Sequence, residues 1–177
     1  DDQKIAQQTL NTLLSLYRNE TNTYIYGALE YAHAGLFDEA IAVLSQVQPK
    51  PNASTHPMVH YYLGWFCQMN GEADAAKKLY RKGAQAAPDY CFPHRLEDIS
   101  ALEQAIIADD SDSLAPYYLG CLYYDKQQYD LAIALWQDSA GKNFQFPTVH
   151  RNLAIASFNH GGNAEKALDL FEKAFSL

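Results

Sequence analysis

Hydrophobic residues recur along this chain with the period of an α-helix. Between residues 94 and 108 they stand three or four positions apart, and the same spacing occurs near the start of the chain. This spacing places apolar side chains on one face of a helix and leaves the other face polar. The residues that set the pattern are Leu10, Leu13, Leu14 and Tyr17, and Leu96, Ile99, Leu102 and Ile106. The pattern predicts an all-α chain.

One short motif occurs twice in the chain. Tyr61-Tyr62-Leu63-Gly64 returns as Tyr117-Tyr118-Leu119-Gly120. Each copy begins a longer pattern that ends in Ala-x-x-x-aromatic or Ala-x-x-x-Leu, and this pattern has the period of a helical repeat, about 34 residues. Its second half occurs as Ala40-x-x-x-Leu44, Ala76-x-x-x-Tyr80, Ala132-x-x-x-Trp136 and Ala167-x-x-x-Phe171. The two copies of the motif are more than one period apart, so the sequence between them holds an insertion.

The repeated pattern resembles the tetratricopeptide repeat (TPR), in which two antiparallel helices, helix A and helix B, form each repeat. Gly64 and Gly120 stand in helix A, where a small residue lets helix B approach closely. The Ala that opens helix B has the same effect from the other side. The resemblance implies an all-α, right-handed α-α superhelix, a TPR solenoid of about ten helices.

The sequence predicts a single domain, residues 1–177, that consists of successive repeats. Full repeats are predicted at 21–54, 57–90, 113–146 and 147–177. Residues 1–20, with Ala6-x-x-x-Leu10, fit helix B of a truncated repeat, so we expect the chain to be a fragment of a longer protein. Residues 91–112 are predicted to form one inserted helix near 94–108 that opens at Phe92-Pro93. The segment Asp109-Asp110-Ser111-Asp112 is predicted to end this helix and to cap the next one.

Residues 88–177 also resemble the C-terminal region of a family of large bacterial proteins, in which a β-rich portion similar to sugar-processing enzymes precedes TPRs. The stretches that carry this resemblance are FPHRLEDISALEQAI, APYYLGCLYYDKQQYDLAIALWQDSA and FPTVHRNLAIASFNH. It implies an alternative function, the structural or regulatory TPR tail of a larger carbohydrate-active bacterial enzyme. This chain contains no catalytic motif of the β-rich portion, so the resemblance implies no active-site residue.

Charge and cysteine content narrow the class of partner and the compartment. A net charge of −8 argues against nucleic acid and against an anionic membrane surface, since both bind clusters of Lys and Arg. Three cysteines without CxxC spacing favour free thiols in a reducing compartment, so we expect a cytoplasmic protein. Cys67 and Cys121 fall on repeat positions and are predicted to be buried, whereas Cys91 lies in a predicted loop and is expected to be the most reactive.

No catalytic, metal or cofactor site is predicted. The sequence contains no Gly-rich phosphate loop and no Ser-His-Asp or Cys-His order. His56 and His60 have the spacing of a two-histidine metal site, but Pro57 places His56 at a helix cap and no acidic ligand stands nearby. We therefore expect the protein not to be an enzyme and to hold no metal or cofactor.

By the TPR resemblance, the second, fifth, ninth and twelfth positions of each repeat line a concave groove. Here those positions are mostly aromatic or aliphatic, which suits an amphipathic helix or an apolar extended segment. Arg151 and Asn152 supply too few donors for the carboxylate clamp that some TPRs use. The predicted partner-binding residues are Tyr61, Trp65, Tyr117, Tyr124, Arg151 and Phe158. The alternative is that these rings only pack the solenoid.

These features together predict a non-catalytic protein-interaction module or scaffold. Its partner would be a protein or peptide segment, including a segment of the same full-length chain, and neither a nucleic acid nor a membrane. A further alternative is a homo-oligomer formed through the last helix, which carries Phe171, Phe175 and Leu177 without a polar capping helix after it.

Overall fold

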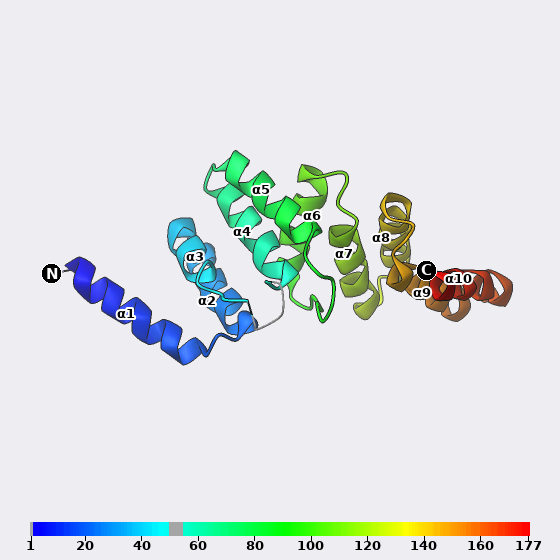
Figure 1. The fold of residues 1–177 in the computed structure, drawn as a ribbon, viewed down its shortest axis with the longest axis horizontal. Helices are drawn as coiled ribbons and strands as arrows, with labels where there is room; N and C mark the ends of the chain where they lie inside the picture. Colours follow the sequence, from blue (N-terminus) through cyan, green and yellow to red (C-terminus); the bar gives the residue numbers. More distant parts are fainter. Residues whose placement is uncertain (1, 50–54) are drawn as a thin grey trace. The chain divides into compact units, whose positions relative to one another are not determined.

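The computed structural model describes residues 2–49 and 55–177, and these residues form ten α-helices and no strand (Figure 1). The chain divides into two compact units, Asp1–Ala87 and Pro88–Leu177. The all-α fold class is confirmed, and successive helices pair within each unit. The assignment of the entire chain to one repeat domain stays a prediction.

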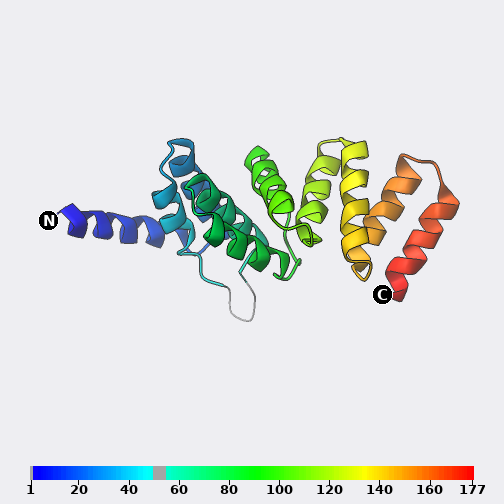
Figure 2. The ribbon, with the colours of Figure 1, turned by 90° about the horizontal axis from the view of Figure 1, so that it is seen from above.

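The first unit contains five helices. Helices α2 and α3 pack side by side, as do α4 and α5, and both α2 and α3 also contact α4 (Figure 2). The bounds are α1 Asp2–Tyr17, α2 Thr21–His33, α3 Phe37–Leu44, α4 Pro57–Met69 and α5 Ala73–Ala84. Tyr17, at the end of α1, packs its ring edge-on to Tyr24 of α2 at 5.0 Å between ring centroids. Residues 50–54, which end the first predicted repeat, and the side chain of Ala6 lie outside the described residues.

The second unit also contains five helices. Helix α6 packs on α7, α7 pairs with α8, α8 contacts α9, and α9 pairs with α10. The bounds are α6 Leu96–Ala108, α7 Leu114–Asp125, α8 Tyr129–Lys142, α9 Pro147–Asn159 and α10 Ala164–Ser176. The last pair, orange and red in Figure 2, is joined by a turn that is one residue longer than the turns of the other pairs.

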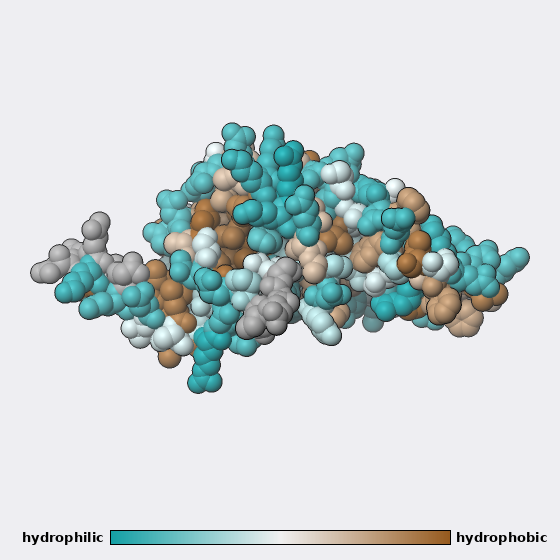
Figure 3. Space-filling model, viewed as in Figure 1, coloured by the Kyte–Doolittle hydropathy of each residue, from teal (hydrophilic) through white to brown (hydrophobic). Residues whose placement is uncertain are grey.

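Helix A and helix B approach closely at the glycines, as the repeat pattern predicts. A Cβ atom built on Gly64 of α4 would lie 2.6 Å from the ring of Tyr80 of α5. One built on Gly120 of α7 would lie 2.6 Å from the indole of Trp136 of α8. Both rings are buried, so each fills the space that its glycine leaves. Hydrophilic residues cover much of the face in Figure 3, with hydrophobic patches between them.

The turn inside each helix pair needs one residue with positive φ. Gly35, Gly71 and Gly162 supply it in three of the pairs, with φ between 60° and 83°. In the pair α7 and α8 the same place is taken by Gln127, with φ of 60°. Its backbone N–H donates to the carbonyl of Tyr124 at 3.0 Å, which is the bond that Gly71 makes to Gln68. The turn geometry is therefore kept although the residue is not glycine.

Helix α6 falls in the frame of a helix B. Asp98 and Leu102 stand one repeat period before Ala132 and Trp136, and both are fully buried. Helix α1 has the same relation to α3, because Ala6-x-x-x-Leu10 precedes Ala40-x-x-x-Leu44 by one period. Each unit therefore begins with a single helix in the helix B frame and continues with two pairs.

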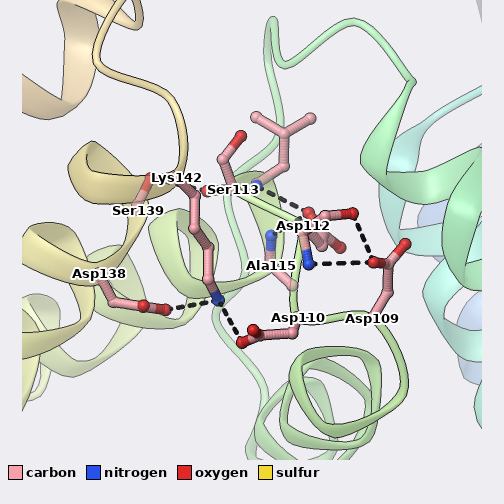
Figure 4. Close-up of polar contacts among 10 residues, drawn as sticks. Asp109, Asp110, Asp112, Ser113, Ala115, Asp138, Ser139 and Lys142 are labelled. Carbon is pink, nitrogen blue, oxygen red and sulfur yellow. Dashed lines mark hydrogen bonds and ion pairs between the residues drawn. The ribbon is translucent and has the colours of Figure 1, made fainter.

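Two buried carboxylates hold the ends of helices in the second unit. Asp112 Oδ1 accepts from the backbone N–H of Leu114 at 2.8 Å and of Ala115 at 3.1 Å, which confirms the predicted cap of α7 (Figure 4). Asp98 Oδ2 accepts from the backbone N–H groups of His94 and Arg95, each at 2.8 Å. The prediction that Pro93 lies in the first turn of α6 is wrong, since α6 begins at Leu96 after this cap.

Candidate functional site

The helix A residues of the second unit form a partly exposed surface. On α7 three side chains stand four and three positions apart and so share one side, and on α9 three more do the same. All six are exposed or partly exposed. We call this the helix-A surface, and it consists of Tyr117, Cys121, Tyr124, Arg151, Ile155 and Phe158.

Contacts between α7 and α9 join the two rows of this surface. Asn152 Nδ2 donates to Cys121 Sγ at 3.6 Å, and Arg151 Nη2 donates to Asn152 Oδ1 at 3.2 Å. Tyr117 packs edge-on to Phe146 at 4.7 Å between ring centroids. The guanidinium of Arg151 is thereby held beside the aromatic row of α7 while remaining exposed.

Tyr124 lies in a cluster of aromatic rings from three helix segments. Its hydroxyl is 3.1 Å from Nε2 of His160, and its ring centroid is 5.1 Å from that of Trp136. The His160 ring stacks on Tyr129 at 3.6 Å between centroids. These contacts fix the orientation of Tyr124, so a partner would meet a preformed ring and not a mobile one.

The side chains of α9 are the most open part of the helix-A surface. Phe158 is 59 % exposed and Ile155 is 36 % exposed. Arg151 also lines an apolar hollow of about 430 Å³ together with Pro147, Phe171 and others from α9 and α10. One cation therefore stands between an exposed apolar patch and an apolar hollow, an arrangement that suits an apolar segment carrying an acidic group.

Tyr61 and Trp65 belong to the first unit, on α4, and only Trp65 reaches the surface. Tyr61 is fully buried, and a Cβ atom on Gly83 of α5 would lie 2.8 Å from its ring. Trp65 is partly exposed and packs on Phe66, with ring centroids 5.5 Å apart. Tyr61 therefore packs between α4 and α5 and offers no surface to a partner. For this residue the burial agrees with the alternative that the ring only packs the helices together.

Two of the three thiols, Cys91 and Cys121, differ from their predicted exposure. Cys91 is buried, so the prediction that it is the most reactive thiol is wrong. Cys67 is buried as predicted, while Cys121 is partly exposed. Burial raises the pKa of the Cys67 thiol, and the Glu72 carboxylate adds to this effect. Burial also raises the pKa of Cys121 despite hydrogen bonds that stabilise its thiolate. Neither Cys67 nor Cys121 is an activated nucleophile at neutral pH.

The described residues show no cluster of metal ligands and no helix suited to span a membrane. His56 Nδ1 accepts from the backbone N–H of Met58 at 3.3 Å, so His56 caps α4 as predicted. Within 2–49 and 55–177, no three His, Cys, Asp or Glu side chains gather as metal ligands would. None of the described helices has the length and apolarity that crossing a membrane requires.

Comparisons with known proteins give similar structures but no family. No protein-family model matches the chain. A crystal structure of MamA is similar, with a TM-score of 0.47 and 22 % identity, over 96 % of this chain and 84 % of that one. MamA 41-end from Desulfovibrio magneticus RS-1 has a TM-score of 0.43 and 17 % identity, over 89 % and 94 %. At these values the similarity adds no residue and no function to the site.

Proposed function

We propose that this chain is a non-catalytic protein-binding module whose helix-A surface holds an apolar helical or extended segment. The observation that carries the proposal is the exposure of Phe158 and Ile155 beside the oriented rings of Tyr117 and Tyr124. Large apolar side chains that stay at the surface in a contiguous group are typical of contact sites. Of the residues predicted from the sequence, Tyr117, Tyr124, Arg151 and Phe158 belong to this surface.

Two kinds of contact would give affinity and orientation. Burying a large apolar side chain contributes roughly 1.5–3 kcal/mol, so Phe158 and Ile155 would supply most of the affinity. Tyr124 adds a rigid ring with a polar end, which is a common anchor in interfaces. Arg151 would pair with an acidic group of the segment and so set its direction.

A displayed peptide library selected on the full chain tests this proposal. Enriched peptides should be apolar with an acidic residue, and their affinity is then measured by fluorescence anisotropy against variants. Phe158→Ser should weaken binding by about tenfold or more, the loss of one buried aromatic anchor. Leu168→Ser, on α10, is the matched control, because Leu168 is 58 % exposed and lies outside the helix-A surface. Equal affinity of wild type and Phe158→Ser for every enriched peptide would contradict the proposal.

A second candidate function is the structural or regulatory tail of a larger carbohydrate-active bacterial enzyme. The stretch that carries this resemblance, 88–177, is the same stretch that packs as the second compact unit. An antibody against this unit, used on the native source, would detect a protein far larger than 19.9 kDa if the tail function holds. Mass spectrometry of that band should find a β-rich region, and its absence would remove this candidate.

Self-association through α10 is a third candidate. Leu168, Phe171, Phe175 and Leu177 are exposed on or just after this helix, and Phe175 is almost fully so. Light scattering at two protein concentrations should then show a mass that rises with concentration, and Phe175→Ser should abolish the rise. A constant monomer mass would exclude this candidate.

A further inference from the structure

A second apolar depression lies between α6 and α8, with α7 as its floor. Its volume is about 510 Å³. We call it the α6–α8 trough and define it by Ile106 and Ile107 of α6, Leu119 and Tyr123 of α7, and Leu131 and Leu135 of α8. All of these residues belong to the second unit.

The trough is distinct from the helix-A surface. Leu119 and Tyr123 follow Tyr117 and Cys121 by two positions, which is about 200° around a helix. The two sets therefore lie on opposite sides of α7. A ligand bound to the helix-A surface therefore leaves the trough open to a different ligand.

The walls of the trough keep apolar side chains in contact with water. Ile107 of α6 is 75 % exposed, and Leu131 of α8 is about half exposed. Along α8 the lining residues Leu131, Ala134, Leu135 and Asp138 stand at intervals of three and four, which gives a continuous stripe along the helix axis. A depression walled by apolar side chains from two helices suits the apolar stripe of another helix.

The rim of the trough carries an excess of negative charge. Glu103 and Asp138 line it, and Asp110 stands fully exposed two residues after the end of α6. The ammonium of Lys142 lies 2.8 Å from Asp138 and 3.8 Å from Asp110, and this side chain is only 12 % exposed (Figure 4). Glu103 also lies against Tyr123, whose pKa is raised by burial and by this carboxylate. Two carboxylates thus share one ammonium, and Glu103 adds a third negative charge to the lining, so the rim stays anionic.

The same sign of charge extends over the whole second unit. Residues 88–177 contain 13 Asp and Glu and 6 Lys and Arg, so they hold −7 of the net charge of −8. Such an imbalance attracts cationic partners and speeds their association, although it does not by itself define a site.

We infer that the α6–α8 trough is a docking site for a basic amphipathic helix of another protein. Leu or Ile side chains of that helix, spaced three and four residues apart, would fill the space between Ile107 and Leu131. Lys or Arg side chains on the flanks would pair with Glu103 and Asp110 at the rim. The apolar lining and the negative rim favour the same ligand, because a basic amphipathic helix matches both.

A synthetic peptide of about 18 residues, with Leu in a helical stripe and Lys on the other faces, is the probe. It should bind the full chain saturably, and raising the salt from about 0.05 M to 0.3 M should weaken binding several-fold by screening the rim charges. Two control peptides separate the contribution of the positive charge from that of the apolar stripe. One carries Glu in place of Lys, and the other keeps the composition but breaks the stripe. Each control peptide should bind the chain at least tenfold more weakly than the probe does.

Variants of α6 locate the binding. Ile107→Ser should weaken the probe about tenfold, because one wall of the trough is lost. Leu96→Ser is the matched control, since Leu96 lies in the same helix with 73 % exposure but outside the trough. Phe158→Ser should leave this binding unchanged, which separates the inference from the proposed function. Unchanged affinity of Ile107→Ser, or equal binding of the Glu peptide, would overturn the inference.

Discussion

At the scale of single residues, the fold depends on pairs of a glycine and a large ring. In the pair α4 and α5 these contacts are reciprocal, because Tyr80 packs on Gly64 and Tyr61 packs on Gly83. In the pair α7 and α8 Trp136 packs on Gly120 and donates its indole N–H to the carbonyl of Tyr117 at 3.2 Å. The ring and the missing Cβ together let two helices approach without leaving a cavity.

Replacing Gly120 with alanine should destabilise the protein. Alanine favours a helix by about 0.5–1 kcal/mol over glycine, but the new Cβ would lie 2.6 Å from the Trp136 indole and 3.1 Å from the carbonyl oxygen of Ala132. Overpacking typically costs about 1–3 kcal/mol, so we expect a net loss of roughly 1–2 kcal/mol in the free energy of unfolding. Urea denaturation measures it.

Gly141→Ala in α8 is the control for that experiment. A Cβ atom there would meet nothing within 4 Å, so only helix propensity acts. The variant should gain about 0.5 kcal/mol of stability. If Gly120→Ala were as stable as Gly141→Ala, close packing would not explain the glycine.

His60 should make the first unit less stable in mild acid. Burial lowers its pKa from 6.5, and Lys82 acts in the same direction. Below pH 6.5 the unfolded chain therefore binds a proton at His60 that the folded chain resists. The stability that goes with a neutral His60 is therefore fully present above pH 6.5 and is lost as the pH falls.

Removing the imidazole should reduce that loss. We expect the free energy of unfolding of His60→Gln to fall less between pH 7 and pH 5.5 than that of the wild type, as measured by urea titration at several pH values. His33→Gln, at the exposed end of α2, is the control for loss of a histidine elsewhere. A His60→Gln variant with the full wild-type pH dependence would show that His60 does not cause it.

At the scale of elements, the turn between α7 and α8 has the least suitable residue for its backbone. Gln127 adopts the left-handed conformation that Gly35, Gly71 and Gly162 supply in the other pairs. Gln127→Gly should therefore stabilise the protein by about 0.5–1 kcal/mol, and Gly71→Gln should destabilise it by a similar amount. Thermal unfolding of both variants checks this. A loss of stability in Gln127→Gly would mean that the Gln127 side chain makes a contact worth more than the backbone cost.

The helices themselves could be predicted from the sequence because their evidence is local. Apolar spacing, the Ala-x-x-x-aromatic motif and the cap at Asp112 each lie within a few residues of the element that they define. The position of α6 in the repeat frame was harder to predict. Its apolar spacing predicted an inserted helix, but not that Asp98 and Leu102, both buried, stand one repeat period before Ala132 and Trp136 in the helix B frame. An aspartate where the repeat has alanine concealed that frame.

At the scale of the whole molecule, exposure is what the sequence could not predict for the candidate site. Tyr61 and Tyr117 occupy equivalent positions in the two copies of the motif, yet Tyr61 is fully buried and Tyr117 is partly exposed. The difference depends on what packs around each helix, which no local pattern records. The stack of His160 on Tyr129 was missed for the same reason, since these residues are far apart in the sequence and belong to no motif.

The most direct test of the protein-binding proposal is an NMR titration of the nitrogen-15-labelled chain with the tightest peptide from the library selection. The proposal predicts saturable shifts concentrated at the backbone amides of α7 and α9, around Tyr117, Cys121, Tyr124, Arg151 and Ile155. Amides of α10 near Leu168 should move little. Shifts concentrated on α6 and α8, shifts spread evenly over the chain, or the absence of saturable shifts would contradict it.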